Sequence, residues 1–236
     1  EPLPEEGALE LLTVAAAFNR MAADLETLER DRAMVLAGIS HDLRTPLSRL
    51  RLALEMSGAD PAATGAMVAD IEEIDAVIGQ FLDFARGADE AKAENDLDGV
   101  AAEVAEHYRR INRNVAFEPG NVPPFRFARL AVRRAITNLV DNALRYAGEP
   151  IEIQVRKVEG NAVLDVLDHG PGIPESESER VKRPFTRLDA SRGARGGAGL
   201  GLAIVDRIAQ AHRGRLELLP REGGGLVARL VLSTHA

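Results

Sequence analysis

The sequence predicts an α plus α/β protein: a helical hairpin that pairs with a second copy into a four-helix bundle, followed by an α/β sandwich. Three observations support this prediction. Apolar residues recur at alternating spacings of four and three through the first third of the chain. Residues 86–96 are polar and lack periodicity. Beyond them, helical patterns are mixed with short runs in which apolar and polar residues alternate, as in half-buried strands.

Composition limits the possible functions. The 236 residues are 45% hydrophobic and 28% charged, which is enough apolar material for a core. Aromatic residues make up 4% and Trp is absent, so the core must consist mostly of Leu, Val, Ile and Ala. A net charge of -8 argues against non-specific binding of nucleic acid, which requires a basic surface. The absence of Cys excludes disulfides, thiolate metal sites and a thiol nucleophile.

No apolar run reaches the ~18 residues that span a bilayer, and no signal peptide is visible. The chain starts at Glu1 without a Met, so we expect it to be a piece of a longer protein.

The first long helix carries a heptad stripe. Such a stripe is the a/d seam of a coiled coil and needs a partner helix. The alternative is a single amphipathic helix on a globular core, which is disfavoured because no such core is available this early in the chain. The stripe positions are Val14, Phe18, Met21, Leu25, Leu28, Arg32, Val35 and Ile39, and only Arg32 is polar.

A helical hairpin follows from the next break. Residues 57–61, Ser-Gly-Ala-Asp-Pro, end the first helix with Gly and Pro. A second helix follows, with apolar residues again four and three apart from Met67 to Ala85. One such hairpin exposes too much Leu and Ile to stand alone, so two copies should pair into a homodimeric bundle. Residues 86–96 then read as a linker with a flexible joint.

The remainder alternates between helices and hairpin-linked strands. Helices on one face of these strands indicate a largely antiparallel sheet, without the crossover rhythm of a Rossmann fold. The predicted helices are 97–111, 127–146 and 199–212, and the predicted strands are 115–117, 151–156, 162–167, 216–219 and 226–232.

The first helix carries a motif of reactive and polar side chains at residues 40–47, Ser-His-Asp-Leu-Arg-Thr-Pro-Leu. His41 and Thr45 lie one turn apart on one face. The carboxylate of Asp42 can hold the neutral imidazole in one tautomer, which leaves Nε2 as a nucleophile. Pro46 removes a backbone donor and bends the helix at the carbonyl of Asp42. Taken alone, His41 also fits an ordinary histidine on an amphipathic helix.

Two glycine motifs point to a nucleotide. Asp168-His-Gly-Pro-Gly follows a strand, and the Asp168 carboxylate could accept a hydrogen bond from an exocyclic amine such as that of adenine. Residues 196–201, Gly-Gly-Ala-Gly-Leu-Gly, open a helix, where backbone N–H groups and the helix N-terminus suit a triphosphate. Each motif alone is more often a turn. The candidate contacts are Asp168, Gly170, Gly172, Gly197, Gly199, Leu200 and Gly201.

A third motif lies on the helix predicted at 127–146. Asn138 and Asn142 are one turn apart, and Arg145 follows. An amide oxygen is a suitable ligand for Mg²⁺ that is already held by phosphates, although paired asparagines are more often surface residues. Residues 175–196 are polar, with Phe185 as an aromatic anchor, and are typical of a mobile lid or of a disordered loop. No P-loop and no ordinary protein-kinase motif is present.

In this order, the motifs resemble the catalytic core of bacterial sensor histidine kinases, and the segment from His41 to Met56 is similar to osmosensor kinases of the EnvZ type. Residues 6–21 resemble the end of a HAMP signal relay. The matched segments are residues 40–47 (H box), 138–147 (N box), 168–172 (G1 box), 184–185 (F box) and 197–201 (G2 box).

The resemblance implies a domain order and a fold. A HAMP-like helix would occupy residues 1–30, and a dimerisation and histidine-phosphotransfer hairpin residues 31–88. A linker would cover 89–96, and a Bergerat-type (GHKL) ATP-binding domain 97–236. The chain would be the cytoplasmic portion of a protein anchored in the bacterial inner membrane.

The resemblance also implies residue roles. His41 would be phosphorylated, Asp42 would activate it, Thr45 would position water for dephosphorylation of the partner, and Arg44 belongs to the same catalytic box. Asn142, with Asn138 nearby, would bind Mg²⁺. Arg145 and Arg187 would face the phosphates, Tyr146 would flank the nucleotide, Phe185 would belong to the lid, and Asp168 would read the adenine amine. Two positions depart from the family pattern: Ala198 replaces a hydroxyl residue, and Lys182 replaces a second aromatic.

The implied function is a homodimeric, bifunctional protein-histidine kinase that uses ATP and Mg²⁺ and signals to the receiver domain of a response regulator. One alternative is an ATP-gated phosphatase or binding module with little kinase activity. Others are a chaperone or topoisomerase ATPase of the same fold, and a structural coiled-coil relay. We expect no role for His107, His169, His212 or His235.

Overall fold

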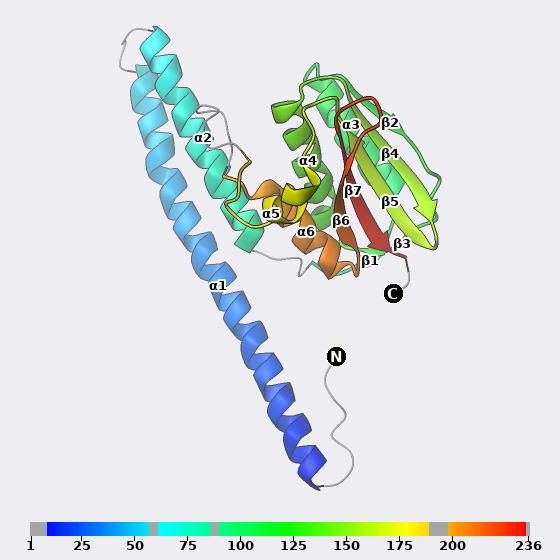
Figure 1. The fold of residues 1–236 in the computed structure, drawn as a ribbon. Helices are drawn as coiled ribbons and strands as arrows, with labels where there is room; N and C mark the ends of the chain where they lie inside the picture. The colour runs from blue at the N-terminus through cyan, green and yellow to red at the C-terminus, as the bar shows by residue number, and fades with distance from the viewer. Residues whose placement is uncertain (1–8, 57–60, 86–89, 189–197, 235–236) are drawn as a thin grey trace. The chain divides into compact units, whose positions relative to one another are not determined.

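The computed structural model of the protein describes residues 9–56, 61–85, 90–188 and 198–234. The chain divides into two compact units, residues 1–86 and residues 87–236. Two long helices make up the first unit, whereas the second combines helices with sheets (Figure 1). Among the described residues, no helix is both long enough and apolar enough to cross a membrane.

The first unit is a hairpin, as the sequence predicts. Helix α1 spans Leu9–Met56, and helix α2, Pro61–Ala85, runs back along the C-terminal half of α1 (Figure 1). An ion pair of 3.1 Å between Arg51 Nη1 and Glu72 Oε1 joins the two helices. Helix α1 is continuous through Pro46 and shows no break near residue 30, where the predicted HAMP-like region ends. Most of the predicted break at residues 57–61 lies outside the described part of the chain.

Nine large apolar side chains described on this hairpin are exposed. Among its described hydrophobic residues, only Ala15 and Leu82 are buried. Burial of apolar surface contributes roughly 25 cal/mol per Å² of stabilisation. A lone hairpin lacks this contribution for its exposed apolar side chains. Side chains of the stripe between residues 25 and 42 are outside the described part. The exposed residues are Val14, Phe18, Met21, Leu43, Leu50, Leu52, Met56, Met67 and Ile74.

The second unit contains a five-stranded sheet in the order β2-β4-β5-β7-β6. Only the pair β2·β4 is parallel, and the other three pairs are antiparallel, which confirms the predicted largely antiparallel sheet. Strand β4 alternates, with Ile151, Ile153 and Val155 buried. The strands are β2 Val115–Glu118, β4 Ile151–Val158, β5 Asn161–Leu167, β6 Arg215–Pro220 and β7 Leu226–Ser233.

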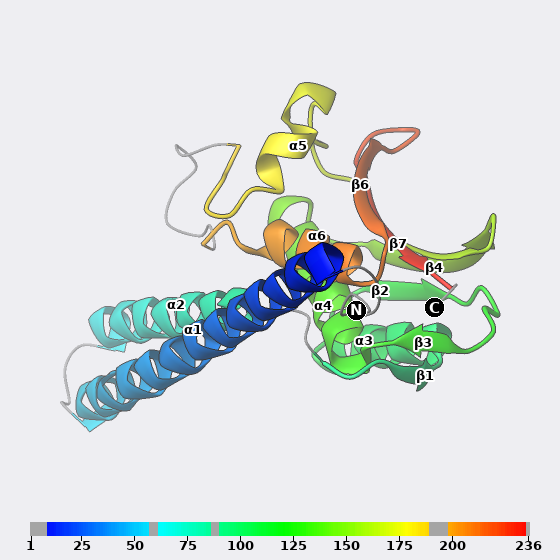
Figure 2. The same ribbon diagram turned by 90° about the horizontal axis from the view of Figure 1, so that it is seen from below.

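Three helices cover one face of this sheet (Figure 2). They are α3 Leu97–Arg110, α4 Arg129–Tyr146 and α6 Gly201–Ala211. Each turns a stripe of apolar residues inward at helical spacing, as Val132, Ile136 and Leu139 show on α4. The core formed between helices and sheet confirms the predicted α/β sandwich.

Two predictions about boundaries are wrong. Residues 93–95, assigned to the linker, form strand β1, Ala93–Asn95, which pairs antiparallel with β3, Phe125–Phe127. Helix α4 therefore begins at Arg129 and not at Phe127. The sequence concealed this pairing because Ala-Glu-Asn has weak strand propensity and its partner lies about thirty residues further on. The predicted lid also contains two short helices, η1 Glu175–Glu177 and α5 Ser178–Val181.

Residues 90–95, here called the entry segment because they begin the second unit's described part, make hydrogen bonds to the ends of two helices. The carboxylate of Glu90 accepts hydrogen bonds from the backbone N–H groups of Leu130 (3.2 Å) and Ala131 (2.9 Å) in the first turn of α4. Lys92 Nζ donates to the carbonyl of Ala211 at 2.5 Å, at the C-terminus of α6. A carboxylate at a helix N-terminus and an ammonium at a C-terminus each complement the helix dipole. The segment is thus part of the second unit's structure.

Candidate nucleotide-binding site and phosphoacceptor helix

The asparagine pair of α4 faces the start of α6. A Cβ atom placed on Gly201 would lie 3.3 Å from Asn138 Oδ1 and 3.3 Å from Asn142 Nδ2. Because Gly201 lacks that atom, the first residue of α6 can approach both amides closely. Two motifs about sixty residues apart in sequence are therefore brought together, and the positive end of the α6 dipole lies beside two amide side chains.

The two amides differ in their partners. Asn138 Nδ2 donates to the carbonyl of Arg134 at 3.0 Å, which fixes the amide along the helix and leaves Oδ1 as an acceptor. The Asn142 amide makes no hydrogen bond within the described residues. A carboxamide oxygen of this kind is a suitable Mg²⁺ ligand when phosphates supply the remaining oxygens.

A partly buried hydrogen bond joins α4 to α3 beside the asparagine pair. The hydroxyl of Tyr108, on α3, donates to Asp141 Oδ1 at 2.5 Å. Burial, followed by this bond to Asp141, raises the pKa of Tyr108, so the phenol remains a donor throughout the physiological range. Sequence reasoning missed both residues, since a Tyr–Asp pair thirty-three positions apart carries no local signal. The bond fixes the rotation of the helix that presents Asn138 and Asn142.

Asp168 directly follows β5, and one of its carboxylate oxygens accepts hydrogen bonds from the backbone. The residue is only 7% exposed. Its Oδ1 atom accepts hydrogen bonds from the backbone N–H groups of Gly170 (2.8 Å) and Leu226 (3.1 Å). Within the described residues, Oδ2 has no partner. A carboxylate held in this way can accept one further hydrogen bond, such as that from an exocyclic amine.

The turn after Asp168 packs against the end of α4. A Cβ on Gly170 would lie 2.7 Å from the Cβ of Ala147, the residue directly after α4. Gly172 has φ +70°, a left-handed conformation that favours glycine. Tyr146 is adjacent and 59% exposed, so its ring is available to a ligand. The predicted G1 and N motifs thus share one border.

The residues around Phe185 are joined to the G2 motif through the backbone. The N–H of Phe185 donates to the carbonyl of Gly199 at 3.0 Å, and Gly199 has φ +70°. The Phe185 side chain is 64% exposed, so in this structure it does not pack as the predicted anchor. Leu200 is buried directly before α6. Gly197 lies outside the described part of the chain.

Two arginines predicted to face phosphates differ in their surroundings. Arg187 Nε is buried and has no hydrogen-bond partner within the described residues. A buried, unpartnered guanidinium donor is costly unless an anion satisfies it. Arg145 is exposed near the end of α4 and has no ion pair in the described part. Within the described residues, Arg187 Nε is therefore a donor that an anion could satisfy.

The donor groups near this site suit a nucleotide. Within the described residues, no cluster of three or more His, Cys, Asp or Glu could hold a metal ion. The donor set that is present consists of amides, backbone N–H groups and guanidinium groups. This set fits a nucleotide whose phosphates bring Mg²⁺ with them.

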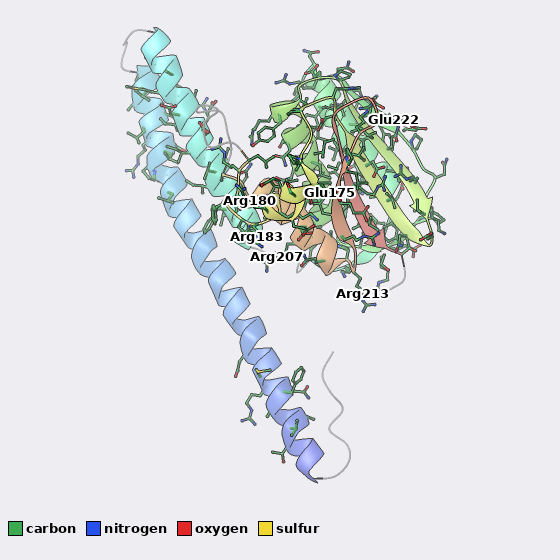
Figure 3. The ribbon with its side chains drawn as sticks, in the orientation of Figure 1. Glu175, Arg180, Arg183, Arg207, Arg213 and Glu222 are labelled. Atoms are coloured by element: carbon green, nitrogen blue, oxygen red, sulfur yellow. The ribbon has the colours of Figure 1, made fainter. Side chains whose placement is uncertain are left out.

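Lys182, two residues before the F box, forms an ion pair. Its Nζ lies 2.6 Å from Glu179 Oε1, and the lysine side chain is only 13% exposed. Burial raises the pKa of Asp206, on α6, and the Lys182 charge opposes that shift. Lys182 thus links α5 to α6 electrostatically where an aromatic side chain is common. Figure 3 labels three arginines in this region. Arg180 is on α5, Arg183 follows α5, and Arg207 is on α6.

The phosphoacceptor candidates lie on α1. Residues 41–45 are helical, so His41 and Thr45 are one turn apart, and Thr45 is exposed. The side chains of His41, Asp42 and Arg44 are outside the described part, and the predicted support of His41 by Asp42 stays a prediction.

Comparison with known proteins identifies the class of protein that this fold and site define. Residues 128–236 match the family model of histidine kinase-, DNA gyrase B- and HSP90-like ATPases. Residues 31–90 match the His Kinase A (phospho-acceptor) domain. Helix α4, strand β5 and helix α6 thus lie in an ATPase module, and the C-terminal part of α1 lies with α2 in a phospho-acceptor module.

Individual relatives narrow the identification. The chain is 37% identical over 232 residues to the sensor histidine kinase GtrS of Pseudomonas aeruginosa, covering 98% of this chain and 48% of that protein. It is 32% identical over 246 residues to the sensor histidine kinase CpxA of Escherichia coli, covering 98% and 53%. The solved histidine kinase domain of the E. coli osmosensor EnvZ is 33% identical, with a TM-score of 0.50, covering 63% of this chain and 92% of that domain.

The chain belongs to the bacterial sensor histidine kinases. It spans about half the length of the full-length relatives that it matches.

Proposed function

We propose that this chain is the catalytic core of an ATP-dependent sensor kinase that phosphorylates itself on His41. One observation carries the proposal: the asparagine pair of α4, the N-terminus of α6 and the open oxygen of Asp168 converge on one border of the second unit. Amide ligands, helix N–H groups and an amine-reading carboxylate are what a nucleoside triphosphate requires.

The proposed binding mode assigns each group a task. Asp168 Oδ2 accepts a hydrogen bond from the adenine amine. The α6 N-terminus, Arg145 and Arg187 bind the phosphates, and Tyr146 flanks the nucleoside. Asn142, with Asn138 nearby, would hold Mg²⁺ together with the phosphates, and the metal would supply neutralisation of charge on the transferring group. The glycines at 170, 172, 197, 199 and 201 and the backbone of Leu200 allow close approach, and Phe185 belongs to the lid.

The proposed reaction is an in-line displacement. The Nε2 lone pair of His41 attacks the γ-phosphorus, and a P–N bond forms while the bond to the β,γ-bridging oxygen breaks. ADP leaves with that electron pair, and Asp42 accepts the Nδ1 proton as positive charge develops on the ring. The phosphoryl group then passes to an aspartate oxygen on the receiver domain of a response regulator. Catalysis would come mainly from positioning and charge neutralisation.

We infer that the active form is a homodimer. The exposed apolar residues of α1 and α2 support this inference, because a second hairpin would bury them. The HAMP-like assignment of residues 1–30, the hairpin at 31–88 and the ATP-binding domain at 97–236 are part of the same proposal. Anchoring in the inner membrane, with this chain on the cytoplasmic side, stays a prediction from the family.

A second candidate function is an ATP-gated phosphatase with little kinase activity. Lys182 favours it, because an ion pair in place of an aromatic contact alters how the lid is held. Ala198 also removes one hydroxyl near the phosphates. In either candidate function, Thr45 would position the water that removes the phosphoryl group from the partner. Arg44 belongs to the same H box.

Labelling with γ-labelled ATP tests the proposal. Wild type should acquire acid-labile, base-stable label, and His41→Ala should acquire none. His107→Ala serves as the control, because His107 is an exposed histidine of the second unit and should label like wild type. Label that persists in His41→Ala would refute the assignment. Weak labelling with strong partner dephosphorylation would favour the phosphatase candidate.

A further inference from the structure

Arg221 bridges two strands beneath the turn that carries Asp168. The residue directly follows β6, and its Nη2 atom donates to Glu152 Oε1 at 2.7 Å. Its Nη1 atom donates to the backbone carbonyl of Asp168 at 3.4 Å. Glu152 pairs in register with Leu167, the residue before Asp168. One guanidinium therefore connects the start of β4 to the end of β5.

The β6–β7 turn, residues 221–225, brings Arg221 to this place. The N–H of Arg221 donates to the carbonyl of Gly225 at 3.1 Å, and the N–H of Gly224 donates to the carbonyl of Arg221 at 3.0 Å. The next side chain along the chain, Glu222, marks the turn in Figure 3. Gly225 has φ +114°, and a Cβ there would lie 2.0 Å from the Asp168 carbonyl oxygen. The turn is thus in direct backbone contact with Asp168.

The same turn orients the Asp168 carboxylate. Leu226, which follows the turn, donates its N–H to Asp168 Oδ1 at 3.1 Å, and its carbonyl accepts the Asp168 N–H at 3.0 Å. Because Oδ1 is held by Leu226, the direction of Oδ2 depends on where the turn lies. Arg221 is the side chain that holds the turn to Glu152 and to Asp168.

We propose that Arg221, oriented by Glu152, is a positioning residue that sets the preference of Asp168 for an amine-bearing purine. This inference rests on the proposed function, in which Asp168 reads the adenine amine. Arg221 touches no nucleotide and acts through the turn. Its side chain is 17% exposed, so the bond to Glu152 is shielded more than a surface ion pair would be.

Paired nucleotides separate positioning from general stability. ATP carries the exocyclic amine, whereas ITP carries a carbonyl at the same position and a proton on the neighbouring ring nitrogen, N1, with the same ribose and triphosphate. Dissociation constants of the whole chain for MgATP and MgITP, measured by calorimetry, give a discrimination ratio. For Arg221→Ala we expect ATP affinity to fall about threefold to tenfold, with ITP affinity falling less than about twofold, so the ratio shrinks.

Three further variants complete the experiment. Glu152→Gln keeps the shape of its side chain and should shrink the ratio less than Arg221→Ala does. Adding Arg221→Ala to Asp168→Ala should not change the ratio further, since the reading carboxylate is already absent. The control is Arg215→Ala, which removes an ion pair of 2.6 Å between Arg215 Nε and Glu217 Oε1 on β6. It should leave the ratio at the wild-type value.

Two results would overturn the inference: equal losses for ATP and ITP, or an unchanged ratio in both Arg221→Ala and Glu152→Gln. If Arg221→Ala does not fold, the Glu152→Gln ratio decides. Wild-type protein that binds neither nucleotide would instead refute the proposed function itself.

Discussion

His212 Nε2 accepts a hydrogen bond of 3.0 Å from the backbone N–H of Ala128, which joins the end of α6 to the start of α4. The other ring nitrogen, Nδ1, lies 2.7 Å from the carbonyl of Ile208 and must donate to it. These two bonds require the neutral imidazole with its proton on Nδ1. His212, for which sequence analysis predicted no role, thus joins the two helices of the proposed nucleotide site.

Protonation of His212 should destabilise the second unit. Burial lowers the pKa of His212, with Lys92 adding to this shift and the Ile208 carbonyl and Glu90 opposing it. In the unfolded chain the group titrates near its ordinary value, so between the two pKa values the unfolded state binds more protons. Stability should therefore fall as the pH drops below about 6.5, by at most about 1.4 kcal/mol per pH unit from this group. Urea unfolding of wild type and His212→Gln at several pH values measures the difference.

His212→Gln should lose part of the wild-type dependence of unfolding on pH. Parallel pH profiles for wild type and His212→Gln would contradict the assignment of a neutral, buried His212.

Asn142→Ala should weaken Mg²⁺-dependent ATP binding by about tenfold or more, because it removes the amide of the pair that has no partner within the described residues. Asn138→Ala should have a smaller effect, since part of that amide is engaged with Arg134. Gln154→Ala removes an amide from β4, away from the site, and should change nothing. Calorimetry with and without Mg²⁺ checks all three. A loss that is equal in the absence of Mg²⁺ would exclude a metal-linked role for Asn142.

Gly201→Ala should reduce nucleotide affinity without unfolding the protein. The added Cβ would meet both asparagine amides at 3.3 Å and push α6 away from them. Gly65 is the matched control, because a Cβ there has nothing within 4 Å. Gly65→Ala lies inside α2 and should raise stability by up to about 1 kcal/mol through helix propensity. ATP affinity and thermal midpoints distinguish the two substitutions. A Gly201→Ala variant with wild-type ATP affinity would show that nucleotide binding does not require the close approach of α6 to the asparagine pair.

Lys182→Met should raise the pKa of Asp206 further. Burial already raises that pKa, and the Lys182 charge is the largest opposing influence. Titration of the Asp206 carboxyl carbon by NMR in both proteins measures the change, with Lys157→Met as a control on an exposed part of β4. An unchanged Asp206 titration would show that Lys182 does not link α5 to α6.

Local sequence predicted the elements that have strong periodicity. The apolar spacing of α1, α2 and α4 predicted long helices, and the alternation of β4 and β5 predicted hairpin strands, because both patterns depend on neighbours within one or two turns. The order of the motifs identified the family. The entry segment was missed, since the role of Glu90 depends on the distant first turn of α4.

The sequence by itself determined the two-part architecture, the family and the residue types that could bind a nucleotide, since helical and strand periods and motif spacing are local properties. Only the tertiary structure decided which of these residues meet. It placed Gly201 against Asn138 and Asn142, gave Asp168 one occupied and one open carboxylate oxygen, and brought Arg221 beneath that residue. Those relationships depend on packing between segments far apart in the chain, and no local pattern encodes them.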